Sequence, residues 1–405
     1  MANVSSSNGL EKRPKLRFPG FDEPLEHKEL LHYLVENTAR NKQLKFGKEN
    51  VLSVSGEYGI VNQIAFQGRS FAGESVADYH VVETDDIVYT KSPLKANPYG
   101  IIKVNNGVPG IVSTLYAVYH PLKTVVPRFV DFYFSNNLRI NKFLKPLVNI
   151  GAKHDMKVNN TFVLTGTVVF PPLREQQKIV DFLTVLDRRI DIQRKKVEAL
   201  KKYKRGLLNQ IFSAISKGSQ RRKLRELVHV SGGKTPSMSN SLYWNGDIVW
   251  ISSKDMKSSR ISGSELKITN LALNEMTLYH PGTLLLVARS GILKHSLPLA
   301  ILEVDATINQ DIKALQVHGC NAFYLYYAIL SQEDNIIRTL VKTGTTVQSL
   351  MMDSFLNIEI PTPDIDLQQS IIDKLAKLEK YVDVQEEELS LLSQMRNGLL
   401  QQLFI

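Results

Sequence analysis

Apolar residues recur at alternating spacings of four and three along two long stretches of the chain, residues 171–213 and 363–405. The apolar seam contains Ile179, Leu183, Leu186, Ile190, Leu200 and Leu207 in the first stretch, and Ile371, Leu375, Leu378, Val382, Leu392 and Leu399 in the second. A seam that repeats every seven residues is typical of a coiled coil. Each stretch is therefore predicted to form one helix, roughly 60 Å long at about 1.5 Å per residue.

The two stretches are copies of one another. Gln176 corresponds to Gln368 and Gly206 to Gly398, a constant offset of 192 residues. A period of this length indicates two copies of a whole module and not a solenoid of short repeats. A plain dimerisation coiled coil would explain the heptads equally well, but not why each stretch follows a globular region.

Short segments rich in Val, Ile and Tyr precede each long stretch and are separated by Gly, Pro, Asn and Asp. These segments are predicted to be strands: residues 51–56, 60–66, 79–83, 85–90, 100–105 and 110–120 in the first half, and residues 247–252, 283–289, 298–304 and 311–317 in the second. A helical period is expected at residues 18–46, 127–145 and 322–340. The order is therefore globular, helix, globular, helix.

The predicted fold class is α+β, with two β-rich domains separated by two long antiparallel coiled-coil helices and an internal pseudo-twofold repeat. The expected parts are a disordered lead-in at residues 1–17, a first domain at 18–170, a long helix at 171–213, a linker at 214–222, a second domain at 223–362 and a second long helix at 363–405.

Charge favours the two long helices as mutual partners. Residues 174–212 contain eleven Lys or Arg against five Asp or Glu, whereas residues 366–405 contain four against seven. Helices of opposite net charge attract one another, and our hypothesis for the register is an antiparallel pairing with Ile179 near Leu403. The ion pairs expected in that register are Arg194 with Glu388, Lys195 with Glu387 and Lys196 with Glu386.

Composition narrows the class of protein further. The net charge of +10 is compatible with an acidic partner such as nucleic acid. Cys320 is the single cysteine, so we expect no disulfide framework, a reducing compartment and a thiol that packs as a small hydrophobe. No apolar run approaches the length of a membrane span, and residues 1–21 lack the apolar core of a signal peptide. A cytoplasmic protein is expected.

No catalytic motif is complete. Gly232-Gly233-Lys234-Thr235 looks like the end of a phosphate-binding loop, but Val228 stands where that pattern needs a glycine. Asn97-Pro98-Tyr99 lacks the second proline of an amino-methyltransferase loop, and the histidines do not have metal-ligand spacing. The joint absence of hydrolase, transferase and metal motifs favours a binding protein, with no catalytic or metal-ligating residue.

The repeated segment of Pro-rich lead-in, Gln-Gln, heptad helix and final Gly-Leu-Leu-x-Gln-x-Phe resembles the specificity subunit of type I restriction-modification enzymes. Residues 344–361, which begin Gly-Thr-Thr-Val, resemble the closing segment of that family, whereas the matching residues 151–172 begin Gly-Ala-Lys-His. The resemblance implies two target-recognition domains that each read one half of a bipartite DNA sequence, and paired helices that set the spacing between the halves.

The same resemblance implies partners and cofactors. The helices would dock two methyltransferase subunits, which carry S-adenosylmethionine and methylate adenine N6. Two motor-nuclease subunits, which use ATP and Mg, would join to cut unmodified double-stranded DNA. This chain would bind no cofactor and catalyse nothing, and its part would be the choice of sequence for methylation and antiviral restriction.

Base readout uses Arg, Lys, Asn, Gln, Ser and Thr held on a scaffold, with further Lys and Arg on the phosphates. The DNA-binding candidates are Arg69, Lys91, Ser92, Lys95, Lys153 and His154 in the first domain, and Lys254, Lys257, Arg260, Arg289, Ser290, Lys294, Gln310, Lys342 and Thr345 in the second. Taken singly, each is also a typical solvated surface residue.

Three alternatives stay open from the residues alone. One is a coiled-coil scaffold or regulator that binds no DNA. It would show no salt-dependent binding to duplex DNA, whereas a protein that contacts phosphates loses affinity steeply as salt rises. Another is an enzyme fused to a specificity module. The third is a stand-alone DNA-binding regulator that recruits no methyltransferase.

Overall fold

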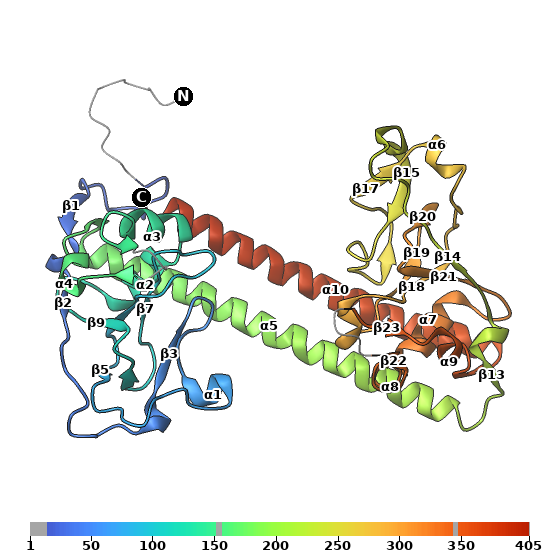
Figure 1. The fold of residues 1–405 in the computed structure, drawn as a ribbon, viewed down its shortest axis with the longest axis horizontal. Coiled ribbons are helices and arrows are strands. Elements are labelled where there is room, and N and C mark those ends of the chain that lie inside the picture. The colour runs from blue at the N-terminus through green and yellow to red at the C-terminus, as the bar shows by residue number, and fades with distance from the viewer. Residues whose placement is uncertain (1–13, 151–155, 343–346, 405) are drawn as a thin grey trace. The chain divides into compact units, whose positions relative to one another are not determined.

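The structure is a computed structural model that describes residues 14–150, 156–342 and 347–404. The chain forms two compact units: unit 1 comprises Met1–Gln193 and Glu388–Ile405, and unit 2 comprises Arg194–Glu387. Two long helices, α5 (Leu173–Ile215) and α10 (Ile365–Gln402), contribute residues to both units. Each unit therefore combines one globular domain with a portion of each long helix (Figure 1).

Unit 1 is built on a four-stranded antiparallel sheet of order β2-β9-β6-β7, with the strands β2 (Leu34–Glu36), β9 (Tyr116–Pro121), β6 (Ile87–Thr90) and β7 (Ile102–Val104). Its two-stranded pairs are β1 (Glu26–Glu29) with β12 (Thr167–Phe170), β3 (Leu52–Ser55) with β4 (Gly59–Asn62), β5 (His80–Val82) with β8 (Gly110–Val112), and β10 (Asn149–Ile150) with β11 (Met156–Lys157). Its short helices are α1 (Gln63–Gln67), α2 (Pro127–Phe134), α3 (Asn137–Leu144), α4 (Asn160–Val163) and the 3-10 turns at Leu30–His32 and Lys48–Asn50.

Unit 2 contains a five-stranded sheet of order β14-β21-β18-β19-β16, with β14 (Val228–Gly232), β21 (Ile312–Val317), β18 (Leu284–Val287), β19 (Leu299–Leu302) and β16 (Arg260–Ile261). A second sheet has the order β17 (Leu266–Ile268), β15 (Trp244–Ile251), β20 (Ala306–Ile308), and the pairs are β13 (Arg221–Lys223) with β24 (Glu359–Pro361) and β22 (Val341–Lys342) with β23 (Ser349–Leu350). The helices are α6 (Asn270–Leu273), α7 (Ala322–Leu330), α8 (Glu333–Leu340), α9 (Met352–Phe355) and the 3-10 turns at Leu224–Glu226, Ser241–Tyr243 and Gly291–Lys294.

The two units repeat the same order of elements. In unit 1 the chain passes through β1, β2, β6, β9, α2, α3, β10, β11, α4 and β12 into α5, and in unit 2 through β13, β14, β18, β21, α7, α8, β22, β23, α9 and β24 into α10. The predicted α+β class and the internal repeat are therefore confirmed. Between these shared elements, unit 2 contains β15, β17 and α6, whose residues Trp250, Ile268 and Ala272 form a separate apolar cluster.

The repeated glutamines show why the copies share polar residues. Gln176 Oε1 accepts a hydrogen bond from the backbone N–H of Val126 at 3.0 Å, just before α2, and its Nε2 donates to the carbonyl five residues upstream at 2.9 Å. Gln368 makes the same two bonds, at 3.0 and 2.9 Å, with the N–H of Asn321 before α7 and the carbonyl five residues upstream. Both amides are buried, so each holds its long helix against its own domain without an unsatisfied polar group.

The apolar seam supplies the packing between the long helices within each unit. In unit 1, Ile179 and Leu183 pack in one cluster with Leu403, and Leu186 and Ile190 pack with Leu392. In unit 2, Ile371 and Leu375 pack with Leu208. Of the remaining predicted seam residues, Val382 is buried, and Leu200, Leu207, Leu378 and Leu399 are half-buried.

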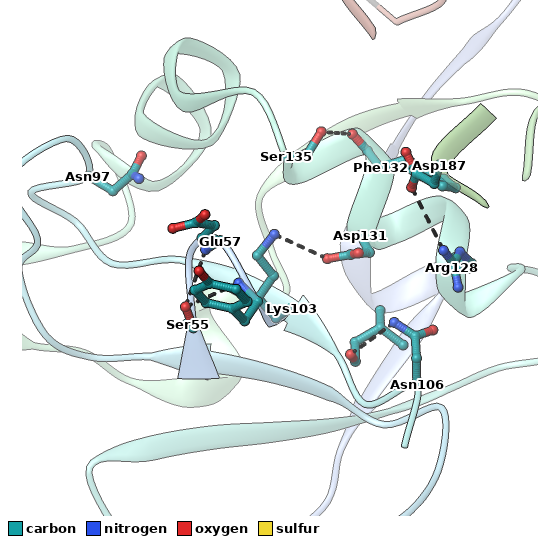
Figure 2. A network of polar contacts seen from close by, with 12 residues as sticks. Ser55, Glu57, Asn97, Lys103, Asn106, Arg128, Asp131, Phe132, Ser135 and Asp187 are labelled. Carbon is teal, nitrogen blue, oxygen red and sulfur yellow. Dashed lines mark hydrogen bonds and ion pairs between the residues drawn. The ribbon is translucent and has the colours of Figure 1, made fainter. Parts of the chain in front are cut away.

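Ion pairs related by the repeat flank this seam. In unit 1, Asp187 accepts a hydrogen bond from Arg396 of α10 and lies 3.8 Å from Arg128 of α2, as Figure 2 shows for the second contact. In unit 2, the equivalent Glu379 pairs with Lys204 of α5 and accepts from the Tyr327 hydroxyl of α7 at 3.0 Å. Each carboxylate therefore contacts the other long helix and one of the two equivalent domain helices, α2 or α7.

The residue-by-residue pairing of the register hypothesis needs correction. Glu388 lies 3.4 Å from Arg189, and Glu386 pairs with Lys201, so each carboxylate meets a cation five residues from the predicted one. Lys196 instead lies 5.6 Å from the centre of the Tyr381 ring, where the π face attracts its ammonium group. The antiparallel direction holds within each unit.

Residues 18–46 do not form the predicted helix. The apolar residues Leu30, Tyr33 and Leu34 have helical spacing and are buried, but the backbone of Glu26–Glu29 pairs with β12 and that of Leu34–Glu36 with β9. Tertiary strand pairing overrides a helical period of this length. The strand predicted at residues 60–66 likewise ends at Asn62, whose side chain caps α1.

The end of the expected disordered lead-in is ordered by contacts within unit 1. The N–H of Leu16 donates to the Gln402 carbonyl of α10 at 3.0 Å, and the Arg17 guanidinium binds the buried Glu175 carboxylate at 2.8 and 2.9 Å. Phe18 packs edge-on against Phe182, with ring centres 5.7 Å apart. Residues 1–13 of the lead-in lie outside the described residues.

Cys320 is half-buried against the core of unit 2, and this burial raises the pKa of its thiol to about 11. Across residues 14–150, 156–342 and 347–404, no helix is long and apolar enough to cross a membrane. Within those same ranges, no group of three or more His, Cys, Asp or Glu side chains could hold a metal ion.

Candidate nucleic-acid interface

Most of the predicted DNA-binding residues of unit 2 lie around the end of strand β18. Arg289 follows this strand and forms an isolated bridge with Ser349 of β23, the partner strand of Lys342. The N–H of Ser290 donates to the Gln348 carbonyl at 3.0 Å, and Lys294 ends the 3-10 turn that follows. The fold therefore brings Arg289, Ser290 and Lys342 together beside the β22–β23 hairpin.

Two further candidates join this group through the backbone. The N–H of Ala288 donates to the Asp311 carbonyl at 2.8 Å, which places Gln310 next to the end of β18. The N–H of Asn309 donates to the Ile251 carbonyl at 2.9 Å, and the Lys254 turn directly follows Ile251. The unit 2 cluster, defined as Lys254, Arg289, Ser290, Lys294, Gln310 and Lys342, therefore occupies one end of adjoining strands.

The Gly-Gly-Lys-Thr segment contributes to this end of the unit as a structural turn. A Cβ on Gly233 would lie 2.0 Å from the Ile308 carbonyl oxygen, so only glycine permits this approach to β20. The N–H of Lys234 donates to the same carbonyl at 3.0 Å, and the Thr235 hydroxyl bonds the Gln310 amide oxygen. The segment therefore positions Gln310.

Lys257 and Arg260 have different surroundings. Both line a cavity of about 440 Å³ whose walls include Lys204, Glu379 and Asp383 of the long helices. The Arg260 guanidinium lies 3.0 Å from the Glu303 carboxylate and stacks 4.8 Å from the centre of the Phe323 ring. Because these contacts satisfy its charge, Arg260 is a poorer DNA-binding candidate than Arg289.

In unit 1, Lys91 is the first residue after strand β6, which is the equivalent of β18. Its ammonium group donates to Asn160 Oδ1 of α4 at 3.2 Å, and Asn160 Nδ2 donates to Glu36 Oε1 at the end of β2 at 2.8 Å. The Tyr119 hydroxyl fixes this helix start by donating to the Asn160 carbonyl at 2.9 Å. Three side chains from distant parts of the chain therefore form one polar chain.

Two more polar residues, Arg40 and His80, lie near these hydrogen-bonded side chains. Arg40 forms an isolated bridge with His80 and donates to the Asp78 carbonyl at 3.0 Å. Burial, with smaller effects of Arg40 and Lys91, lowers the pKa of His80 to about 4. Burial and the nearby Arg40 also lower the pKa of Lys91, while Glu36 opposes this shift. The unit 1 cluster, defined as Glu36, Arg40, His80, Lys91 and Asn160, is thus electrostatically coupled.

Sequence reasoning identified only Lys91 of this cluster. Glu36 and Asn160 are 124 positions apart, and no local motif signals their meeting. Of the other first-domain candidates, Arg69 stacks 4.6 Å from the centre of the exposed Phe71 ring, and Ser92 and Lys95 lie in the loop after β6. Lys153, His154 and Thr345 lie outside the described residues.

The fold therefore defines a protein of two related α+β domains carried on paired long helices. A family model described as the type I restriction modification DNA specificity domain matches residues 73–202 and 216–394, and the chain belongs to this family.

Named relatives agree with this family. The specificity subunit of the type I restriction enzyme EcoR124I/EcoR124II from Escherichia coli is 38% identical over 160 residues, covering 38% of this chain and 40% of that protein. The type I restriction enzyme MjaIX specificity subunit from Methanocaldococcus jannaschii is 29% identical over 190 residues, covering 45% and 43%. The matched part of the chain therefore spans about two fifths of the length of these curated relatives.

Solved structures share the fold over nearly the whole chain. The crystal structure of the type I restriction-modification S subunit from M. genitalium covers 97% of this chain and 99% of that one, with a TM-score of 0.59 and 14% identity. A chain from a structural study of complex assembly and conformational transition of the type I R-M system covers 96% and 99%, with a TM-score of 0.56 and 15% identity. These likenesses concern the fold.

Proposed function

We propose that this chain selects the DNA sequence for a type I restriction-modification complex, with each domain reading one half of a bipartite site. The observation that carries the proposal is the equivalent placement of the two clusters. Each lies at the end of the equivalent strand, β6 or β18, in two copies of one fold, and each combines Lys or Arg with amide side chains. This is the chemistry of base and phosphate contact.

In this proposal the long helices connect the two readers. Because α5 and α10 each run from one unit into the other, the number of residues between the domains would set the distance between half-sites. In this proposal the bases between the half-sites are not read. In this proposal the helices therefore set the distance between the half-sites, and the clusters read the bases.

The methyltransferase subunits would dock on the exposed faces of the helices and not on the seam. The seam residues Leu186 and Ile190 are buried within the chain itself, whereas Val185 and Ile192 on α5 are 70% and 58% exposed. Leu391 and Met395 on α10 are exposed as well. Exposed apolar residues at spacings of seven and four lie on one face of a helix and mark an interaction surface.

The chemistry would reside in the partners. Two methyltransferase subunits would supply S-adenosylmethionine and transfer its methyl group to adenine N6, and two motor-nuclease subunits would supply ATP and Mg. This chain would direct both activities to one sequence.

A methylation map tests the proposal. The chain is co-expressed with the methyltransferase encoded beside it, and N6-methyladenine is mapped across the host genome with and without the chain. We expect a split motif, methylated in both halves only when the chain is present. Absence of chain-dependent methylation, with the methyltransferase shown to be made, would contradict the proposal and favour a scaffold or stand-alone regulator.

A further inference from the structure

The polar chain Glu36–Asn160–Lys91 is held together by its own hydrogen bonds, at 2.8 and 3.2 Å. All three side chains are half-buried. The amide orientation of Asn160 follows from its neighbours, since an ammonium group can only donate and a carboxylate can only accept. Each side chain therefore has a defined orientation before any ligand arrives.

Unit 2 provides an internal comparison for each of these positions. Glu36 pairs with Tyr119 of β9, and in unit 2 Val230 pairs with Leu315 of β21. Tyr119 and Leu315 are equivalent, because they pair with the first residues of β6 and β18 respectively. Val230 therefore takes the place of Glu36.

The other two positions follow in the same way. Asn160 and Met352 are the first residues of the equivalent helices α4 and α9. Lys91 is the first residue after β6, and Ala288 is the first after β18. Val230 and Met352 pack against the core of unit 2, and Ala288 is buried.

The scaffold therefore does not need polar residues at these positions. The same three sites are filled by Val, Ala and Met in the other copy of the fold. Withdrawing a carboxylate, an ammonium group and an amide from water costs free energy that their mutual hydrogen bonds only partly offset. A polar chain kept at a site where an apolar packing is available points to a function other than stability.

We propose that Glu36, Lys91 and Asn160 together read base edges of the first DNA half-site. Their three chemistries are those of major-groove readout: the amide matches adenine, the ammonium group matches guanine and the carboxylate accepts from the cytosine amino group. Arg40, exposed beside them, supplies positive charge toward the phosphates. The inference rests on the proposed function and names the readers of one half-site within it.

The test replaces the three residues by their unit 2 equivalents, in the triple variant Glu36→Val, Lys91→Ala, Asn160→Met. The full chain is co-expressed with its methyltransferase, and the methylation motif is mapped as for the unchanged chain. We expect discrimination at one or more positions of the first half-site to fall about 10- to 100-fold, while the second half-site stays intact. The thermal midpoint should be unchanged or higher, because all three hydrogen-bonded side chains are replaced together by apolar ones and none loses its partner while it stays polar.

Controls separate the outcomes. Glu74→Val with Lys48→Ala changes an exposed glutamate and an exposed lysine of the same unit, and should leave the motif unaltered. Glu36→Gln keeps the shape of the side chain and should relax the first half-site alone, even if the triple variant folds poorly. An unchanged first half-site in Glu36→Gln and in a folded triple variant would overturn the inference while the proposed function stands. No chain-dependent motif with the unchanged chain would overturn both.

Discussion

Single residues fix the orientation of each domain on its long helix. Gln176 and Gln368 use buried amides to bond a domain backbone, and Asp187 and Glu379 each contact two other elements. The equivalent roles explain why these residues recur at the same offset in the two halves. Lys91, by contrast, has an apolar counterpart in unit 2, Ala288, and this difference between the copies is one ground for the reading role that we propose for Lys91.

His80 makes unit 1 sensitive to acid. The pKa of His80 is lowered to about 4, first by burial and then by Arg40 and Lys91, whereas an unfolded histidine titrates near pH 6.5. Because the unfolded chain binds the proton more tightly, stability should be fully present above about pH 6.5 and fall as the pH drops toward 4. We expect His80 to account for about 2 kcal/mol of the stability lost between pH 7 and 4.5.

Denaturant unfolding of the full chain at a series of pH values, followed by far-UV circular dichroism, measures this effect. In His80→Asn, the free energy of unfolding should fall less steeply with decreasing pH than in the unchanged chain. Above pH 7 the two proteins should show the same pH dependence. His295→Asn, at an exposed histidine of unit 2, is the matched control. Parallel curves for all three proteins would contradict the assignment.

At the scale of elements, each long helix has apolar residues both in the buried seam and on an exposed face. The seam face is buried within the chain, and a second face exposes Val185 and Ile192. The heptad pattern indicated the seam but not the second face, because sequence spacing does not show which apolar residues are covered by the fold. Burial in the structure separates the two.

Substitutions on the two faces should affect different properties: those in the seam should lower stability, and those on the exposed face should weaken methyltransferase docking. Leu186→Asp should lower the free energy of unfolding by about 3 kcal/mol or more, because it places a charge in the buried seam. Val185→Asp with Ile192→Asp should leave the thermal midpoint within the range of ordinary surface changes but abolish co-purification of the methyltransferase. Retained co-purification in a folded Val185→Asp, Ile192→Asp variant would place the docking surface elsewhere.

At the scale of the whole molecule, two copies of one fold predict independent readers. Arg289 lies in the unit 2 cluster, which shares no residue with Glu36, Lys91 and Asn160. Arg289→Ala should therefore relax the second half-site by roughly 1–3 kcal/mol and leave the first unchanged. The methylation motif of the variant measures both halves at once, and Arg225→Ala, an exposed arginine of the same unit, is the control. Loss of discrimination in both halves would contradict independence.

The sequence by itself determined the long helices, the repeat and most strands of the two domains. These features depend on local periodicity and on identities at a fixed offset, such as Gln176 with Gln368, which need no knowledge of tertiary contacts. It also predicted Lys91 and Arg289 as DNA-binding candidates, since a cation after a buried strand is visible locally.

Only the tertiary structure decided which distant residues meet. The backbone of residues 26–36 pairs as strands despite a helical spacing of apolar residues, because its partners are β12 and β9. Glu36 meets Asn160 through that same pairing, and Glu388 meets Arg189 through the packing of two helices. Such contacts join segments that are far apart in the sequence, and the free energy that selects them comes from burial and pairing across the fold, which no local pattern records.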